Sequence, residues 1–169
     1  MKTIRDIDVK DKIVLVRVDY NVPLKDGKVE SDLRIRASLP TLNYLLENGA
    51  KRIVLMSHLG RPEGKVDEKY TLSPVVDALK KLLPGQIIKF CPLPKEGEVI
   101  SVPENAKIVL LENLRFDPGE EGNLETFIKR IVDATRAEVY VQDGFAVIHR
   151  AHASTDAVKK FLPVYAGFC

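Results

Sequence analysis

Five short apolar runs, separated by longer amphipathic stretches, constrain the fold of this chain more than any other feature of its sequence. The runs are rich in Val and Ile, and most of them do not alternate with polar residues. Strands of a parallel sheet that is covered on both faces have this pattern. We therefore expect five buried strands, over Ile13–Val18, Ile53–Met56, Ile87–Phe90, Ile108–Leu111 and Val139–Val141.

The stretches between these runs carry helical patterns. Leucines recur at helical spacing before Asn48-Gly49, a typical helix stop, and Ser73 and Asn123 are residue types that cap helix N-termini. We expect helices over Leu39–Leu46, Ser73–Leu83, Asn123–Val132 and Thr155–Phe161. Because strands alternate with helices, the predicted fold class is α/β: a doubly wound, three-layer parallel sheet of Rossmann-like type with helices on both faces.

Size and composition indicate one globular domain. The chain has 169 residues, of which 45% are hydrophobic and 30% charged. No apolar run approaches the ~20 residues of a membrane helix, and the charged N-terminus lacks the apolar core of a signal peptide. We expect a cytoplasmic monomer with no membrane partner. Cys91 and Cys169 are expected to be free thiols, since they form neither a disulfide framework nor a metal-type spacing.

Polar side chains are dense where four of the expected strands end. They lie in Asp19–Pro23, Ser57–Pro62, Glu112–Phe116 and Asp143–His152. In a doubly wound sheet such loops converge on one crevice, which would bring Arg61, Arg115, Arg150 and all three histidines to one edge. Arginine recognises phosphate esters through paired hydrogen bonds, so we expect a polyanion site. The net charge of +2 gives no case for nucleic-acid binding.

Some of these residues admit a second interpretation. A single arginine after a strand is commonly a solvated surface residue. His149 and His152 could ligate a metal, but no third ligand follows at a recognisable spacing, so we expect no metal. Asp19 could be a catalytic base, or it could accept hydrogen bonds from a ligand hydroxyl or from loop amides.

A nucleotide site has no support in this sequence. Gly60–Lys65 reads GRPEGK, which is too short for a phosphate-binding loop, and Val66 stands where a Ser or Thr would hold magnesium. No G-x-G-x-x-G follows any expected strand. We therefore expect no cofactor on this chain.

Five segments resemble, in order and spacing, the N-terminal domain of phosphoglycerate kinases. They are Val16–Leu24 (VRVDYNVPL), Asp32–Arg36 (DLRIR), Ser57–Pro62 (SHLGRP), Leu111–Phe116 (LENLRF) and His149–His152 (HRAH). The resemblance implies one lobe of a two-lobed glycolytic kinase. In that family the N-terminal lobe binds 3-phosphoglycerate or 1,3-bisphosphoglycerate, and the C-terminal lobe binds Mg-ATP or Mg-ADP.

The resemblance also implies roles for individual residues. The expected substrate-binding residues are Asp19, Asn21, Arg34, His58, Arg61, Arg115, Arg150 and His152. Arg61, Arg115 and Arg150 would bind the substrate phosphate, and Asp19 and Asn21 would hold the hydroxyl end of the substrate. Arg34 is also the expected catalytic residue, because its counterpart faces the transferring phosphoryl group. A carboxylate nucleophile needs no general base, so positioning and charge stabilisation would do the work.

Two departures from the family pattern bear on these expectations. Asp143–Ile148 reads DGFAVI where the family usually reads Asp-Ala-Phe-Gly-Thr-Ala, which affects the loop that aims Arg150. The sequence ends at Cys169, about where the family continues into an interdomain helix. Residues 1–169 are thus expected to be a substrate-binding domain without the nucleotide-binding domain, and inactive alone. The alternative is a folding or interaction module with no productive ligand binding.

Overall fold

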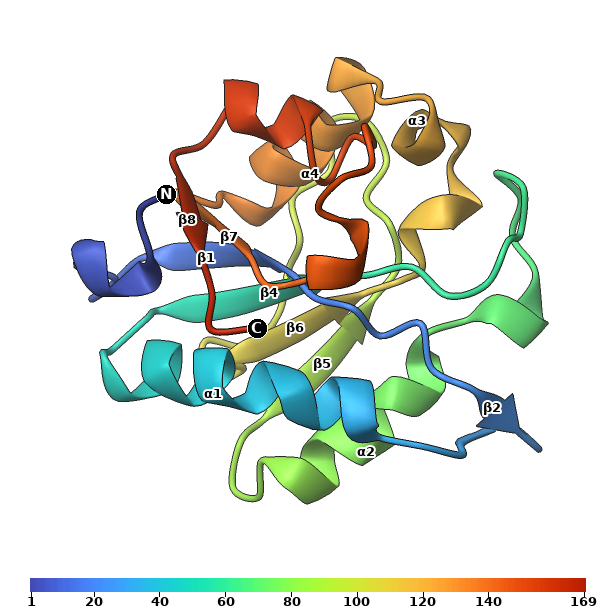
Figure 1. Ribbon diagram of the computed structural model, residues 1–169, viewed down its shortest axis with the longest axis horizontal. Coiled ribbons are helices and arrows are strands. Elements are labelled where there is room, and N and C mark those ends of the chain that lie inside the picture. The colour runs from blue at the N-terminus through green and yellow to red at the C-terminus, as the bar shows by residue number, and fades with distance from the viewer.

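A six-stranded parallel sheet forms the centre of the computed structural model, which describes residues 1–169 (Figure 1). The strands lie in the order β5-β6-β4-β1-β7-β8, and every neighbouring pair is parallel. Their bounds are β1 (Ile13–Arg17), β4 (Arg52–Met56), β5 (Ile88–Cys91), β6 (Ile108–Leu111), β7 (Val139–Gln142) and β8 (Val164–Ala166). The first strand therefore lies inside the sheet, between β4 and β7.

Helices cover both faces of this sheet. The α-helices are α1 (Leu33–Glu47), α2 (Ser73–Leu82), α3 (Pro118–Glu121) and α4 (Glu125–Thr135). The 3-10 helices are η1 (Ile4–Asp6), η2 (Glu68–Tyr70), η3 (Leu114–Phe116), η4 (Phe145–Val147) and η5 (Ala157–Lys160). Strands β2 (Leu24–Lys25) and β3 (Lys28–Val29) form a separate antiparallel hairpin. Figure 1 shows α1 and α2 on one side of the sheet and α3 and α4 on the other.

Alternate residues of each central strand enter two different cores. In β1, Val14 and Val16 belong to the cluster beneath α1 and α2, whereas Ile13 and Leu15 belong to the cluster beneath α4 and η5. This two-sided burial is why the strands read as continuous apolar runs instead of alternating ones. The expected doubly wound α/β fold is confirmed.

The sequence predicted neither the β2–β3 hairpin nor the last strand of the central sheet, β8. β8 has three residues, all half-buried; it pairs with β7, and on its other side Ala166 forms a single parallel bridge with Thr3. A strand of three half-buried residues leaves no long apolar run in the sequence, so the pattern gave no sign of it. The expected boundaries at Val18 and Ile87 also shift by one residue, since β1 ends at Arg17 and β5 begins at Ile88.

Two helix starts differ from the expectation. α1 begins at Leu33, well before Leu39. The leucine pattern did not predict this start, because the first turns of the helix carry exposed polar residues and no leucine repeat. α4 begins at Glu125 with Leu124 as its N-cap, so Asn123 is not the cap. Asn123 adopts a left-handed conformation with φ 52°.

The Asn123 side chain instead links the start of α4 to η5. Its Oδ1 accepts the Ala157 N–H at 3.1 Å, and its Nδ2 donates to Asp156 Oδ2 at 2.9 Å. The expected last helix over Thr155–Phe161 is shorter in the structure, where it is the 3-10 helix η5 (Ala157–Lys160). No helix in the structure has both the length and the apolar character needed to cross a membrane.

The packing of α4 gives a stability prediction. Ile128→Ala should lower the free energy of unfolding by about 2–5 kcal/mol, because Ile128 is fully buried against the sheet and truncation leaves a cavity. Lys129→Ala is the matched control on the same helix; its ammonium is exposed and pairs only with Asp133, so the loss should stay near 0.5 kcal/mol. Urea denaturation measures both. Equal small losses would contradict the assignment of α4 as a core helix.

Candidate functional site

The loops that follow β1, β4, β6 and β7 meet at one edge of the sheet. Parallel register places Arg17 opposite both Met56 and Gln142, so these strands end together. Backbone hydrogen bonds continue past the strand ends: Val18 N–H donates to Met56 O at 3.0 Å, and Asp143 N–H donates to Arg17 O at 2.9 Å. The polar loops are thus held side by side, as expected for ligand sites of open α/β sheets.

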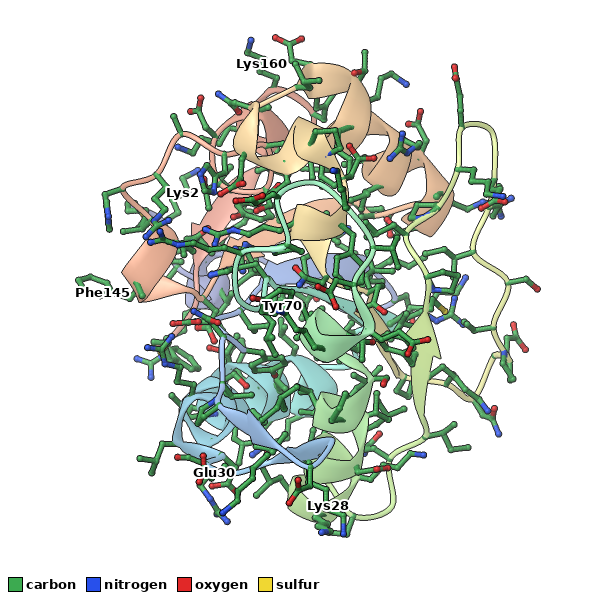
Figure 2. All side chains as sticks on the ribbon, turned by 90° about the vertical axis from the view of Figure 1, so that its right-hand side faces the viewer. Lys2, Lys28, Glu30, Tyr70, Phe145 and Lys160 are labelled. Atoms are coloured by element: carbon green, nitrogen blue, oxygen red, sulfur yellow. The ribbon has the colours of Figure 1, made fainter.

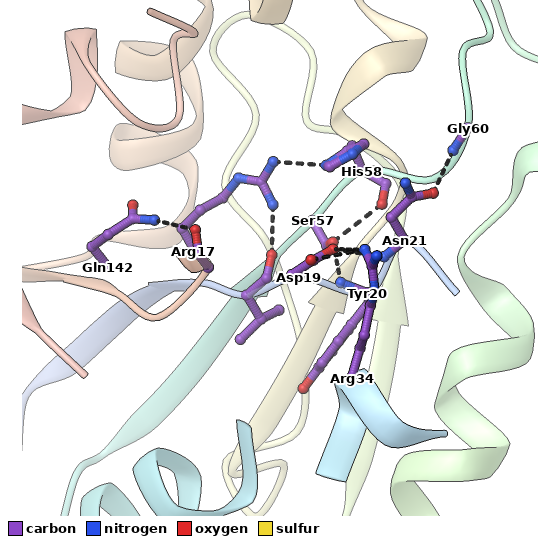
Figure 3. Close-up of polar contacts among 11 residues, drawn as sticks. Arg17, Asp19, Tyr20, Asn21, Arg34, Ser57, His58, Gly60 and Gln142 are labelled. Atoms are coloured by element: carbon purple, nitrogen blue, oxygen red, sulfur yellow. Dashed lines mark hydrogen bonds and ion pairs between the residues drawn. The ribbon is translucent and has the colours of Figure 1, made fainter. Parts of the chain in front are cut away.

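Asp19, Asn21 and Arg34 form the first group of site residues (Figure 3). One guanidinium nitrogen of Arg34, Nη1, donates to both carboxylate oxygens of Asp19, at 3.0 and 2.8 Å. The Asn21 N–H donates to the same carboxylate at 3.2 Å, and Asn21 Oδ1 accepts the Gly60 N–H at 3.0 Å. Arg34 remains half-exposed while Asp19 is mostly covered. The helix α1 and the loop after β1 together bring this group into place.

Asn113 fixes the loop after β4. Its Nδ2 donates to Leu59 O at 2.7 Å and to Tyr70 O at 2.9 Å, and its Oδ1 accepts the N–H groups of Leu59 and Arg115. Gly60 has φ 61°, and a Cβ there would lie 2.4 Å from the Tyr70 ring. Only glycine fits such a position without displacing the ring. The backbone of Gly60 is therefore presented rigidly to the site.

Arg115 is the most unusual side chain of the site. It is buried, with 3% exposure, and its Nη1 donates to Gly60 O at 2.9 Å. Its Nε lies 3.6 Å from the Glu121 carboxylate, and Nε and Nη2 make no hydrogen bond. The Nδ1 of His152 is also buried without a partner. Buried donors without acceptors are costly, so this arrangement favours an anionic ligand.

We call the group formed by His58, Arg115, Arg150 and His152 the positive cluster. Burial is the main cause that lowers the pKa of His58, to about 2, and the charges of Arg17, Arg115, Arg150 and His152 lower it further. Burial also lowers the pKa values of Arg115 and His152. The positive charges in this group disfavour one another's protonated forms, and a bound anion would offset that effect.

Arg61, His149 and Arg150 do not have fixed partners. All three are exposed, and their side chains make no hydrogen bond or ion pair within the protein. The charge of Arg150 is one of the smaller causes that lower the pKa values of His58 and Arg115, which is why Arg150 is grouped with them. The structure shows no such effect for Arg61 or His149. The expected gathering of three arginines and three histidines at one edge stays a prediction for Arg61 and His149.

The DGFAVI loop adopts a defined conformation. Gly144 lies against β1, where a Cβ would be 3.3 Å from Arg17 O, and Val147 is buried. The three residues of η4 turn Phe145 outward, where it is 73% exposed (Figure 2). Glycine at position 144 thus serves the close approach of this loop to β1, and hydrophobic burial of Val147 takes the place of a hydroxyl.

Sequence reasoning missed several residues that build the site. They are buried polar or charged residues. Ser57, Asn113 and Asp143 lie in the polar segments named from the sequence but were given no role there; the others are Arg17 at the end of β1, Glu120 in α3 and Ser154 before η5. Arg17 gave one usable signal, because it is a charge inside an otherwise apolar run. Glu120 and Ser154 gave none, since their partners come from distant parts of the chain.

Cavities do not coincide with the positive cluster. A cavity of about 260 Å³ lies beside Asp19 and Arg34 and is also lined by Asp143 and Cys169. The largest cavity, about 690 Å³, lies away from the strand ends, between the β2–β3 hairpin and α2. We place the site by its unpaired buried donors and not by cavity size, because charge and hydrogen-bonding capacity decide anion binding. No group of three or more His, Cys, Asp or Glu side chains could hold a metal.

Comparison with known proteins identifies the family. The family model described as "Phosphoglycerate kinase" matches residues 4–169. This chain belongs to the phosphoglycerate kinase family. It is 46% identical over 168 residues to the phosphoglycerate kinase of Pelotomaculum thermopropionicum and 52% identical over 165 residues to that of Elusimicrobium minutum. These matches cover 98% and 96% of the chain, but only 42% and 40% of the relatives.

Solved structures agree with this assignment. The phosphoglycerate kinase of Coxiella burnetii superimposes with a TM-score of 0.83 at 34% identity, over 97% of this chain and 41% of that structure. The enzyme of Pyrococcus horikoshii gives 0.80 at 30% identity, over 99% and 42%. The chain thus spans about two fifths of its phosphoglycerate kinase relatives and corresponds to their N-terminal domain.

Asp143 anchors the last residues of the chain beside the site. Its Oδ1 accepts the Thr41 hydroxyl at 2.6 Å and the Cys169 N–H at 3.1 Å, while Oδ2 is buried without a partner. Thr41 Oγ1 in turn accepts the Phe168 N–H at 2.8 Å. Burial raises the pKa of Asp143 to about 6, against the lowering effect of these hydrogen bonds.

This raised pKa predicts how stability depends on pH. The folded chain holds a proton on Asp143 more tightly than the unfolded chain, where an Asp titrates near ~3.9. The free energy of unfolding should therefore fall as pH rises from about 4 to about 6, by the contribution of this group. Asp143→Asn should remove that fall, whereas Asp77→Asn, an exposed control on α2, should leave it in place. Denaturant titrations at several pH values measure it, and equal slopes in the wild type and Asp143→Asn would refute the prediction.

Proposed function

We propose that this chain is the substrate-binding domain of a phosphoglycerate kinase and binds 3-phosphoglycerate at the positive cluster. The observation that carries the proposal is Arg115, a buried guanidinium with two nitrogens that have no hydrogen-bond acceptor in the protein. A phosphate dianion supplies both the acceptors and the charge that this cluster lacks. In the complete enzyme the reaction would be 3-phosphoglycerate + ATP = 1,3-bisphosphoglycerate + ADP.

The Gly60 peptide supports a single elongated site. Its N–H donates to Asn21 and its C=O accepts from Arg115, so it joins the group around Asp19 to the positive cluster. We infer that the ligand phosphate lies at the cluster and that its hydroxyl end lies at Asp19 and Asn21. His58 and His152 would line the ligand between these ends, and Arg61, on the same loop as Gly60, would turn toward the phosphate.

Arg34 would serve the transferring group. The reacting carboxylate is already a nucleophile, so catalysis depends on position and on stabilising charge on the phosphoryl oxygens. Arg34 is half-exposed and is held only by an ion pair with Asp19. Its guanidinium group can therefore turn toward a phosphoryl group outside this domain.

The nucleotide would be bound by the other domain. The residues of this chain do not fit Mg-ATP, because they include neither a phosphate-binding loop nor a group of acidic ligands for magnesium. When bound, the nucleotide supplies the phosphoryl group and its metal. We propose that this chain binds and orients the acceptor, and that it is inactive without a nucleotide-binding domain.

A titration tests substrate binding directly. The 169-residue chain should bind 3-phosphoglycerate, more weakly at high salt because part of the site is exposed to screening. Arg115→Met should weaken binding by roughly 10- to 100-fold, the effect of about 1.5–3 kcal/mol from charged hydrogen bonds. Arg36→Met is the control: it removes the same charge from an exposed position of α1. Calorimetry measures the affinities.

Two outcomes of that titration would count against the proposal. No saturable binding at millimolar ligand would favour the alternative function, a folding or interaction module. Equal weakening by Arg115→Met and Arg36→Met would show that the charge of the whole domain, and not the buried donors, attracts the ligand.

The complete enzyme separates the roles of Arg34 and Arg61. Arg34→Ala should lower kcat by about 100-fold or more, on the order of 3–4 kcal/mol, because charge on the phosphoryl oxygens shifts only in the transition state. Arg61→Ala should mainly raise KM, since the substrate phosphate keeps its charge throughout. A coupled assay gives both constants, and the 169-residue chain should give no turnover in it. A change confined to KM in Arg34→Ala would move Arg34 to the substrate-anchoring set.

A further inference from the structure

Arg17 is a fully buried arginine at the carboxyl end of β1, in the middle of the sheet. Its guanidinium contacts three different groups. Nε donates to Ser154 Oγ at 2.8 Å, and Nη1 donates to Val18 O at 2.6 Å. Nη2 lies 2.9 Å from His58 Nδ1 (Figure 3). A guanidinium held by three partners from three segments of the chain has one fixed orientation.

Glu120 compensates the buried charge of Arg17 through Ser154. The Ser154 hydroxyl donates to Glu120 Oε1 at 2.5 Å, and the Ser154 N–H donates to Oε2 at 3.0 Å. Glu120 is itself fully buried, and it is the leading charge that favours the cationic form of Arg17. A buried arginine without a compensating carboxylate would be strongly destabilising, so this bridge explains how the cation is retained.

The contact with Arg17 decides the state of the His58 ring. Arginine has only donors, so His58 Nδ1 must accept, and the ring proton must stand on Nε2. The charged groups that face His58 are Arg17 from β1, Arg115 from η3, and Arg150 and His152 from the loop after η4. None of these neighbours favours an imidazolium, and burial opposes it further.

We propose that Arg17 is a positioning residue that locks His58 as the neutral tautomer with its proton on Nε2. His58 then presents a single neutral donor at the one ring nitrogen that no protein group bonds. The claim that this donor binds a phosphate ester rests on the proposed function, whereas the claim about the His58 tautomer does not. The Nε2–H group can then donate one hydrogen bond of fixed direction to an anion. Because the ring stays neutral, this hydrogen bond would not depend on pH between about 5 and 8.

The ring state can be read without any ligand. In the chain carrying ¹⁵N-labelled histidine, long-range proton–nitrogen spectra should show His58 Nδ1 as an unprotonated acceptor and Nε2 as protonated. Both shifts should stay constant from pH 8 down to pH 5. A His58→Gln variant assigns the signals. A proton on Nδ1, or an imidazolium at pH 6, would overturn the proposal in the wild-type chain alone.

Paired variants test the cause. Arg17→Met with Glu120→Gln removes both buried charges together, so the fold is preserved and the acceptor contact to Nδ1 is lost. His58 should then show a mixture of tautomers. Glu120→Gln alone keeps Arg17 but leaves its charge uncompensated, so this variant should be less stable, while the His58 tautomer in its folded form should be unchanged. If the double variant folds and keeps the wild-type His58 shifts, Arg17 is not the cause.

Binding of 3-phosphoglycerate provides the second arm. In the double variant its affinity should fall by about two- to tenfold, the effect of one misdirected hydrogen bond. If the tautomer behaves as proposed but the wild-type chain does not bind 3-phosphoglycerate at all, the proposed function fails and the assignment of Arg17 stands. An unchanged affinity in a double variant with mixed tautomers would refute the use of His58 as the directed donor.

Discussion

Parallel pairing of β1 with both β4 and β7 is the constraint on which the rest of the structure depends. It brings the first strand of the chain into the interior of the sheet and aligns three carboxyl ends at one edge. The side chains that follow these strands have to share that edge, whatever their charge. Burial of alternate residues in two cores fixes the register, since a slip of one residue would exchange the faces of every strand.

As a consequence, positive charge is crowded at this edge. The protein compensates the charge of one buried arginine but leaves that of another largely uncompensated. Arg17 is matched by Glu120 through Ser154, so the deepest cation is compensated within the protein. Arg115 has only the exposed Glu121 carboxylate at 3.6 Å and a backbone carbonyl. The buried guanidinium of Arg115 therefore keeps a charge that the protein compensates only in part. Under the proposed function, this difference between a satisfied and an under-satisfied arginine is what an anionic ligand would use.

The sequence predicted the sheet, its two-sided burial and the strand ends that carry the site, because each depends on local patterns of two to six residues. It did not predict β8, which depends on an edge contact with β7, or the true start of α1, which is polar. The network of Glu120 with Ser154 joins residues 34 positions apart, and the pairing of Arg17 with Ser154 spans 137. Such contacts leave no periodic trace. The roles of the individual site residues stay predictions.

Rigidity is distributed unevenly among the charged residues of the edge, and this has a mechanistic meaning under the proposed function. His58 and Arg115 are buried and held by Arg17 and by the Gly60 carbonyl, so their geometry is set before any ligand arrives. Arg34 is held only by a half-exposed ion pair, a contact worth about 0–1 kcal/mol, and Arg61 and Arg150 have no partner. A phosphate that stays unchanged in the reaction is best met by fixed donors. A phosphoryl group delivered from another domain requires donors that can turn. His58 and Arg115 fit the first requirement and Arg34 fits the second, whereas Arg61 and Arg150 would turn toward the substrate phosphate when it binds.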